Sequence, residues 1–148
     1  MPPPLRPATL RLEVFGHETE DQSRVKRTLF SPPEDVDETV VTGGYGNRIF
    51  IHGVVFKEKK AASFFEKVVD SLTPDDRSAV LSELEDHVDD EGEFCIKLDK
   101  QEAYNGRIKF LPSGSNVVSL TLKFANFKRD KRPVVDYIRE AIEKREAR

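Results

Sequence analysis

Apolar and polar residues alternate along three stretches of the chain, which is the pattern of a β-strand with one buried face. These stretches are residues 9–15, 94–98 and 117–127. In the last of them the apolar positions are Val118, Leu120, Leu122 and Phe124, and the polar positions between them are Ser119, Thr121 and Lys123. This alternation predicts an antiparallel sheet with one face open to solvent.

Two further stretches predict strands by their composition. Residues 48–56 are rich in Ile, Val and Phe with few polar positions, which favours a strand in the middle of a sheet. Residues 107–111 are expected to pair with the strand that follows, because residues 112–116 have the composition of a turn. The acidic residues 34–38 and the glycine-rich residues 43–47 bracket a loop or an irregular hairpin.

Four stretches predict helices, because their apolar residues recur at helical spacing. They are residues 19–30, residues 58–72, residues 74–91 and a C-terminal stretch that begins near Pro133. Thr73 has the side chain of an N-cap, and Pro74 suits the first helical position. Gly92 is expected to end that helix as a C-cap in the left-handed conformation.

These elements follow one another in the order β-α-β-α-α-β-β-β-α. The sequence therefore predicts an α+β fold, a two-layer sandwich with a mainly antiparallel sheet and helices on one face. Residues 1–8 contain several prolines and no periodic pattern, so we expect a flexible leader there. Residues 9–148 are then a single domain.

The composition narrows the class of protein. The chain has 148 residues, of which 37% are hydrophobic and 34% charged, so a globular domain with a core is expected. No apolar stretch approaches the ~18 residues of a membrane span, and we expect a cytoplasmic protein without a membrane partner. Cys95 is the only cysteine, which excludes an internal disulfide.

Charge is distributed unevenly along the chain. Residues 1–56 carry six Lys/Arg against eight Asp/Glu, residues 57–96 carry five against twelve, and residues 97–148 carry thirteen against seven. A basic last third indicates a surface that meets a polyanion. The sequence pI of about 5.7 confines such a surface to one part of the molecule.

The candidate residues for binding a polyanion such as RNA come from two places. The basic set is Lys123, Lys128, Arg129, Lys131 and Arg132, with Phe127 beside it as a stacking surface. Arg107 and Lys109 join this set if their strand pairs with Lys123 across a ladder. In the glycine-rich loop, Tyr45 can stack on a base while Arg48 meets a phosphate.

Other functions find less support in the sequence. No nucleophile and base stand at a spacing that indicates catalysis, so we expect a protein that is not an enzyme and needs no cofactor. The acidic residues 83–91 do not match a calcium loop, and no metal is predicted. Their alternative use is protein–protein docking, which would make the chain an adaptor; the family resemblance described next implies an RNA-processing complex or the ribosome as its partner.

Several segments carry a resemblance to a known family. They are Gly16–Asp21, Gly43–Asn47, Leu72–Arg77, Val88–Gly92 and Leu98–Tyr104. In order and spacing they resemble the archaeal predicted exosome-associated RNA-binding proteins. The resemblance implies a fold like that of the ribosomal L-five protein, RNA binding, an archaeal source, and a link to RNA processing by the exosome or to the ribosome and translation.

Overall fold

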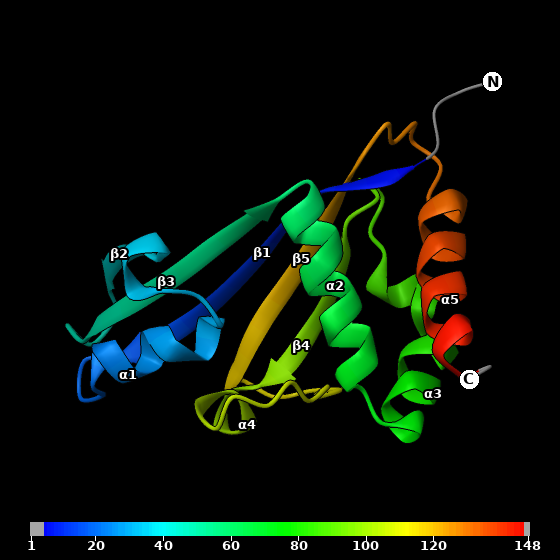
Figure 1. Cartoon of the computed structure of the whole chain (residues 1–148). Coiled ribbons are helices and arrows are strands. Elements are labelled where there is room, and N and C mark those ends of the chain that lie inside the picture. Colours follow the sequence, from blue (N-terminus) through cyan, green and yellow to red (C-terminus); the bar gives the residue numbers. More distant parts are fainter. Residues whose placement is uncertain (1–4, 147–148) are drawn as a thin grey trace. The chain divides into compact units, whose positions relative to one another are not determined.

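A computed structural model describes residues 5–146 (Figure 1). Five strands form one antiparallel sheet in the order β2-β3-β1-β5-β4. The strands are β1 (Arg6–His17), β2 (Asp37–Thr42), β3 (Arg48–Lys57), β4 (Phe94–Asp99) and β5 (Val117–Ala125). The predicted α+β class with an antiparallel sheet is confirmed.

Helices connect most of these strands. They are α1 (Gln22–Lys26), α2 (Lys59–Ser71), α3 (Pro74–Ser82), α4 (Lys100–Tyr104) and α5 (Arg132–Glu146), with short 3-10 segments η1 (Arg27–Leu29), η2 (Pro33–Asp35) and η3 (Leu84–His87). Among the described helices, none has the length and apolar composition that crossing a membrane requires. The chain divides into two compact units, which are described separately below.

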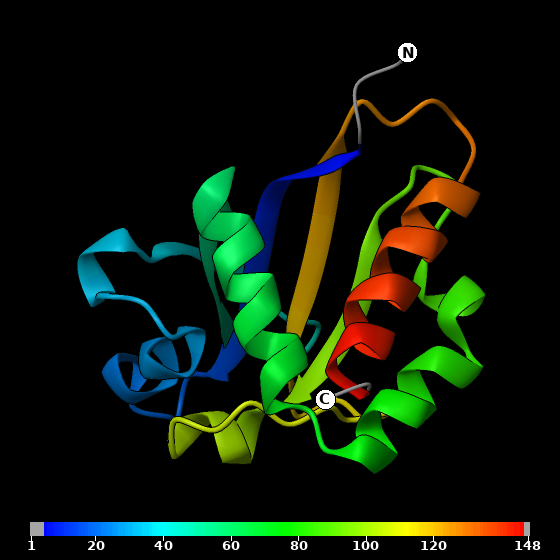
Figure 2. The ribbon, with the colours of Figure 1, turned by 45° about the vertical axis from the view of Figure 1, so that its right-hand side comes forward.

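Unit 1 consists of the residues up to 10, residues 55–96 and the residues from 121 onward. Its helices α2, α3 and α5 cover one face of its strand segments (Figure 2). Phe65 of α2 meets the rings of Phe94 and Tyr137, with centroids 6.1 Å and 6.2 Å away. Phe124 lies 5.1 Å from the Tyr137 ring. The apolar face predicted for β5 therefore contributes to this core.

Unit 2 consists of residues 11–54 and 97–120. The inward residues Leu12 and Val14 of β1 are fully or almost fully buried, as are Val25 and Leu29. The helix that begins near residue 19 in the prediction is shorter in the structure. Asp21 caps α1 by accepting a hydrogen bond from the Ser23 backbone N–H at 3.0 Å.

The predicted loop or irregular hairpin around residues 34–47 is a regular hairpin of β2 and β3. Asp37 pairs with Gly53, and Thr42 pairs with Arg48. All six residues of β2 are exposed, so neither face shows the alternation that marks a half-buried strand. Because β2 takes the edge, β3 is second from the edge and not in the middle of the sheet.

The strand predicted at residues 107–111 is wrong. Only one bridge forms there, between Leu98 and Phe110. Two hydrogen bonds flank it, from the Asp99 N–H to the Lys109 carbonyl at 2.8 Å and from the Leu111 N–H to the Lys97 carbonyl at 2.9 Å. The alternation of Ile108 and Phe110 is real, since both are buried, but the chain turns away before a ladder extends. The preceding helix α4 was not predicted from the sequence pattern.

Gly92 does not end a helix. Helix α3 ends at Ser82, and Gly92 closes a tight turn in which its N–H donates to the Asp89 carbonyl at 3.0 Å. The backbone of Gly92 has a φ of 76°. The positive φ is therefore as predicted, but a tight turn requires it and not the end of a helix. At the other end of the chain, β1 begins at Arg6 instead of Thr9, and residues 1–4 of the predicted leader lie outside the described residues.

Candidate nucleic-acid interface

Lys128 and Arg129 are adjacent predicted cations that remain available for a ligand. Both are exposed in the loop between β5 and α5. Within residues 5–146, no hydrogen bond or ion pair engages either side chain. Arg129 holds a left-handed backbone with φ of 60°, a conformation that costs energy outside glycine. The loop thus presents two adjacent, solvated cations.

Two other members of the basic set are neutralised by acidic neighbours. Lys123 lies 3.3 Å from Glu93. The guanidinium of Arg132 makes two parallel contacts with Asp130, at 3.1 Å and 2.9 Å. The hydrogen bond from Arg132 holds the pKa of Asp130 below its usual value. Neither cation is therefore as attractive to phosphate as its sequence position suggested.

The Lys131 side chain binds backbone groups of its own chain. Its Nζ donates to the backbone carbonyls of Glu85 and Val88, at 3.2 Å and 3.4 Å. These carbonyls lie at the end of η3, where the helix dipole favours a cation. The acidic segment at residues 83–91 therefore already receives a positive charge from its own chain, and it needs no cationic partner for that purpose.

Arg107 and Lys109 do not join the basic set as predicted. The strands next to β5 are β1 and β4, so no ladder places these two residues opposite Lys123. Arg107 pairs instead with Glu102 at 2.8 Å. Lys109 is exposed.

Tyr45 and Arg48 lie at the tip of the β2–β3 hairpin, in unit 2. Tyr45 is 97% exposed. Its ring is therefore available to stack on a base. Arg48 is tied to Glu18, because its backbone N–H donates to the carboxylate at 3.0 Å and its Nε lies 3.9 Å from it. The turn between the strands needs Gly46, whose φ is 81°.

Phe127 is not the free stacking surface that its position predicted. Its ring lies directly over Gly92, so closely that a Cβ on residue 92 would collide with it. The ring is half-buried. Phe127 therefore fixes the tight turn before β4 to the end of β5.

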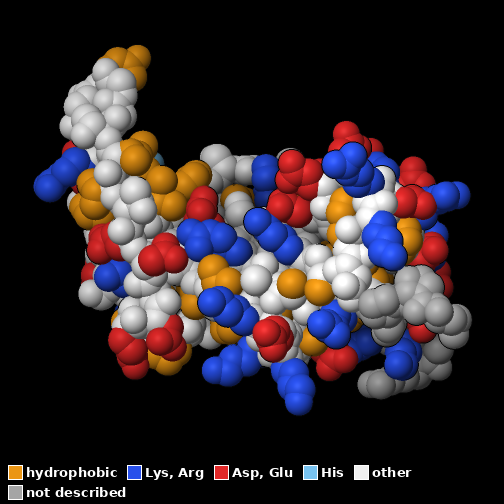
Figure 3. Space-filling model, turned by 90° about the horizontal axis from the view of Figure 1, so that it is seen from above, with side chains coloured by type: hydrophobic (Ala, Val, Ile, Leu, Met, Phe, Trp, Pro, Cys, Tyr) orange, Lys and Arg blue, Asp and Glu red, His pale blue; other side chains and the backbone are white. Residues whose placement is uncertain are grey.

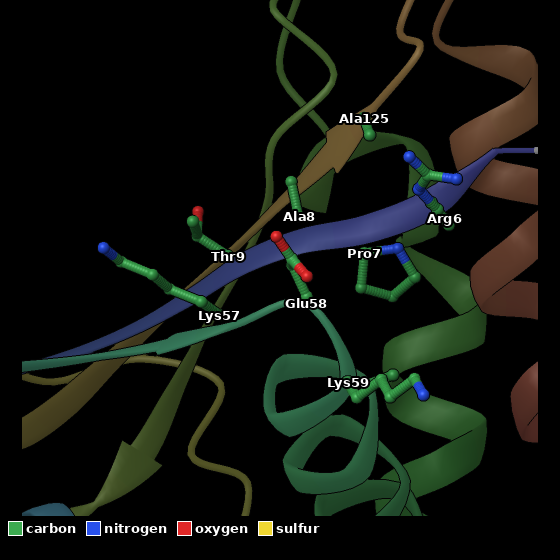
Figure 4. Close-up of a pocket in the computed structure, with 9 residues that line it drawn as sticks. Arg6, Pro7, Ala8, Thr9, Lys57, Glu58, Lys59 and Ala125 are labelled. Atoms are coloured by element: carbon green, nitrogen blue, oxygen red, sulfur yellow. The ribbon is translucent and has the colours of Figure 1, made fainter.

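Sequence reasoning missed a hollow in unit 1 that is bordered by cations. A hollow of about 700 Å³ lies where the start of β1, the end of β3, the start of α2 and the end of β5 meet (Figure 4). It is lined by Arg6, Pro7, Ala8, Thr9, Lys57, Glu58, Lys59, Ala62 and Ala125. We call it the basic groove. The N–H of Glu58 donates to the Ala8 carbonyl at 2.8 Å, and this bond joins two of its walls.

The charges of the basic groove favour an anion. Arg6, Lys57 and Lys59 are exposed cations, and Glu58 is the one acidic residue in the lining. The first turn of α2 carries no acidic residue and no side-chain cap. The N-terminal end of a helix favours negative charge, so the cations in this turn are unfavourable for the helix and an anion would relieve them. Figure 3 views the molecule from above the view of Figure 1, and it shows several Lys and Arg side chains near the centre of that face. The sequence feature that could have indicated this groove is the run Lys57-Glu58-Lys59-Lys60 at a strand–helix junction.

Comparison with known proteins adds to this geometry. Residues 9–124 match the model of a family described as RNA binding. The chain belongs to this RNA-binding family. It is 34% identical to the RNA-binding protein PAB1135 of Pyrococcus abyssi, over 94% of this chain and 96% of that protein.

Solved structures of archaeal proteins have the same fold. Protein AF2318 from Archaeglobus fulgidus, titled a DUF54 protein, is 25% identical and superposes with a TM-score of 0.76, over 92% of this chain and 99% of that one. A DUF54 protein from Methanothermobacter thermautotrophicus is 23% identical, with a TM-score of 0.74 over 93% and 98%. The RNA-binding family match includes Lys57 and Lys59, whereas Arg6, Lys128 and Arg129 lie outside its bounds.

Two segments that carry the resemblance to RNA-binding proteins meet in unit 2 through a buried lysine. Lys100 is 4% exposed, and its Nζ donates to the Phe15 carbonyl at 2.8 Å and to Glu20 at 3.1 Å. The Tyr104 hydroxyl donates to the same carboxylate at 3.0 Å. Burial and the Glu20 charge raise the pKa of Tyr104 to about 12. The charge of the buried Lys100 is compensated by the half-buried Glu20, so this contact stabilises the fold.

A second buried contact in unit 2 joins α1 to β3. The Gln22 side chain donates to the His17 carbonyl at 2.6 Å, and its oxygen lies 2.8 Å from His52 Nε2. Gly16 is required beside it, because a Cβ there would collide with the Gln22 oxygen. His52 is fully buried, and burial lowers its pKa. Sequence reasoning missed this contact because its members are far apart in the chain.

One group in unit 1 brings acidic and thiol atoms together. Asp89, Glu93 and Cys95 place one ligand atom each within 4.8 Å of one another. Asp89 already accepts hydrogen bonds from the Glu91 and Glu93 N–H groups, both at 2.9 Å. Burial raises the pKa of the Cys95 thiol, which disfavours the thiolate that a metal would need. We assign no metal to this group.

Proposed function

We propose that this protein is a non-catalytic RNA-binding protein that holds the backbone of single-stranded RNA in the basic groove. The observation that carries the proposal is the set of three cations, Arg6, Lys57 and Lys59, around one hollow in a chain of the RNA-binding family. A groove that tracks the backbone is the usual means of binding a single strand with little sequence preference.

The groove acts through charge. Each phosphate that a cation neutralises releases counterions, and this release supplies most of the affinity. Glu58 also lines the groove, and its carboxylate repels phosphate. Lys128 and Arg129 follow the end of β5 and extend the positive surface.

The proposal also covers the cellular process in which the protein binds RNA. The resemblance to predicted exosome-associated proteins supports a place in RNA processing by the exosome, or in ribosome function and translation, in the cytoplasm. A ribosomal L-five-like fold stays a prediction of the same resemblance. Lys131 weakens the alternative of an adaptor that docks through residues 83–91, because it already provides a cation at that segment.

The test compares two triple variants of equal charge change. Arg6→Gln, Lys57→Gln and Lys59→Gln remove the groove cations. Arg27→Gln, Lys97→Gln and Lys144→Gln form the control, since these three are exposed and no described contact engages their side chains.

RNA affinity is measured at several salt concentrations with an oligouridine probe. The groove variant is expected to flatten the slope of log K against log salt by about 2.1, that is about 0.7 for each lost phosphate contact. The control is expected to keep the parental slope. Equal slopes in the two variants would remove the groove as the site, and a parent without salt-dependent binding would refute RNA binding itself.

A further inference from the structure

A second hollow lies beside the basic groove in unit 1. It has a volume of about 370 Å³ and is lined by Phe56, Lys59, Lys60, Ser63, Phe64 and Lys67. Phe56 belongs to the end of β3, and the other five belong to the N-terminal part of α2. Lys59 also lines the basic groove, so the two hollows share one cation.

The hollow combines aromatic rings with a rim of cations. The rings of Phe56 and Phe64 are stacked, with centroids 4.7 Å apart and planes at 9°. The Lys67 Nζ lies 6.0 Å from the centroid of Phe64. Lys59 and Lys60 are exposed in the first turn of α2. An apolar aromatic surface bordered by ammonium groups suits a flat, uncharged ring that is attached to a phosphate.

We propose that this hollow receives one nucleobase of the RNA strand whose backbone lies in the basic groove. The base contacts the half-buried ring of Phe56, which is backed by the buried Phe64, while Lys59 and Lys60 hold the phosphates on either side of it. Every base has a π face, so this contact adds affinity without selecting a sequence. The inference rests on the proposed function, because the shared residue Lys59 is what connects the base to the bound backbone.

The shared cation and the aromatic pair favour a base over an acyl chain. A fatty acid or anionic lipid also combines an apolar part with an anion. A lipid, however, has no aromatic ring to stack on the phenylalanines, and it has no chain of phosphates to occupy the adjoining basic groove. Lipid binding is therefore the alternative outcome of the test.

The experiment uses two probes of equal charge and length. One is a uridine decamer, and the other is a decamer of the same ribose–phosphate backbone without bases. The parent is expected to bind the uridine probe roughly tenfold more tightly, the scale of one stacked base. Phe56→Leu is expected to reduce this ratio toward one and to leave the salt slope unchanged. Phe15→Leu, at an exposed phenylalanine of unit 2, is the matched control.

A second variant protects the test against loss of folding. Ser63 is exposed at the hollow, so Ser63→Leu fills the space without removing a core side chain. It is expected to lower the ratio of the two affinities as Phe56→Leu does, with thermal melting unchanged.

The failures of the two proposals are distinguishable. A salt-dependent parent whose two probes bind equally, or whose ratio survives both variants, overturns the base site and leaves RNA binding in place. A parent that binds neither probe in a salt-dependent way refutes the proposed function. Binding to vesicles of anionic phospholipid that Ser63→Leu abolishes, together with equal binding of the two probes, assigns the hollow to lipid.

Discussion

The basic groove contains a residue with strained backbone, Glu58. Among residues 5–146, the non-glycine residues with positive φ are Phe30, Glu58, Asn126 and Arg129. Glu58 lines the groove, and Asn126 follows the groove residue Ala125. Such conformations cost about 1–3 kcal/mol each and persist where the surroundings impose them. At Glu58 the cause is the abrupt change from β3 to α2, with φ of 51° and ψ of −116°.

Glu58→Gly is expected to stabilise the protein and to strengthen RNA binding. Glycine adopts this φ without strain, and after its own entropy cost the gain is about 1 kcal/mol in the free energy of unfolding. Loss of the carboxylate also removes repulsion of phosphate. Glu58→Gln is the control, because it removes the charge and keeps the strain. Urea unfolding and RNA affinity are measured on both, and a Glu58→Gly variant less stable than Glu58→Gln would contradict the strain.

His52 is a buried titratable group with consequences for stability. Its Nε2 lies 2.8 Å from the Gln22 oxygen, and its Nδ1 has no hydrogen-bond partner among the described residues. The neutral ring suits this site, since Nε2 can donate while Nδ1 stays unprotonated. Burial is the largest cause of its lowered pKa.

The lowered pKa of His52 predicts loss of stability in mild acid. The stability is fully present above the unfolded value of 6.5 and is lost as pH falls toward the lower folded pKa. The slope reaches up to about 1.4 kcal/mol per pH unit below pH ~6.5. His52→Phe is expected to flatten the profile between pH 7 and 5 in urea unfolding. His17→Gln, at an exposed histidine, is expected to leave it unchanged, and an equally steep His52→Phe profile would exclude His52 as the cause.

At the scale of elements, the turn between η3 and β4 depends on one glycine for two separate reasons. Gly92 has a positive φ, and the Phe127 ring occupies the space where a Cβ would lie. Gly106 has a similar φ of 73° with nothing within 4 Å of its Cβ position. The two glycines therefore separate the cost of conformation from the cost of collision.

Gly92→Ala is expected to destabilise the protein more than Gly106→Ala. The second variant costs about 1 kcal/mol, the penalty of left-handed backbone. The first adds about 1–3 kcal/mol, because Phe127 must move in a packed environment. Thermal and urea unfolding measure both. Equal losses of stability in the two variants would mean that the Phe127 ring moves aside without lowering the free energy of unfolding.

At the scale of the whole molecule, the binding surface depends on which cations remain unpaired. The last third of the sequence carries an excess of six positive charges, yet Lys123, Arg132 and Arg107 are paired with carboxylates and Lys131 is bound to carbonyls. Each paired cation must exchange its partner before it binds phosphate, which reduces its contribution. Lys128 and Arg129 pay no such cost.

Lys128→Gln with Arg129→Gln is expected to account for most of the contribution of the β5–α5 segment to RNA binding. The slope of log K against log salt should flatten by about 1.4, for two phosphates. Adding Lys131→Gln and Arg132→Gln should change the slope little further. Lys131→Gln should instead lower the melting temperature, since the η3 carbonyls lose their cation. A slope that falls by about 2.8 for all four would show that the paired residues bind RNA as well.

Local pattern predicted the elements whose signal is carried by their own residues. Strand β5, helix α2 and helix α5 were expected near their observed positions, because alternation or helical spacing already specifies which face is buried. Thr73 was expected as a cap and accepts a hydrogen bond from the Asp76 N–H at 3.1 Å. Asp99 caps α4 in the same way, but the turn-rich residues around it concealed a helix of five residues.

The sequence by itself determined the α+β class, the main helices and the presence of a basic region, because these depend on neighbours within a few residues. Only the tertiary structure decided that β2 is a strand, since its exposed residues are ordered by pairing with β3. It also decided the candidate site. Arg6 and Lys57 line the same hollow because β1 and β3 are antiparallel neighbours, so the start of one strand lies beside the end of the other. No pattern within either strand encodes that juxtaposition.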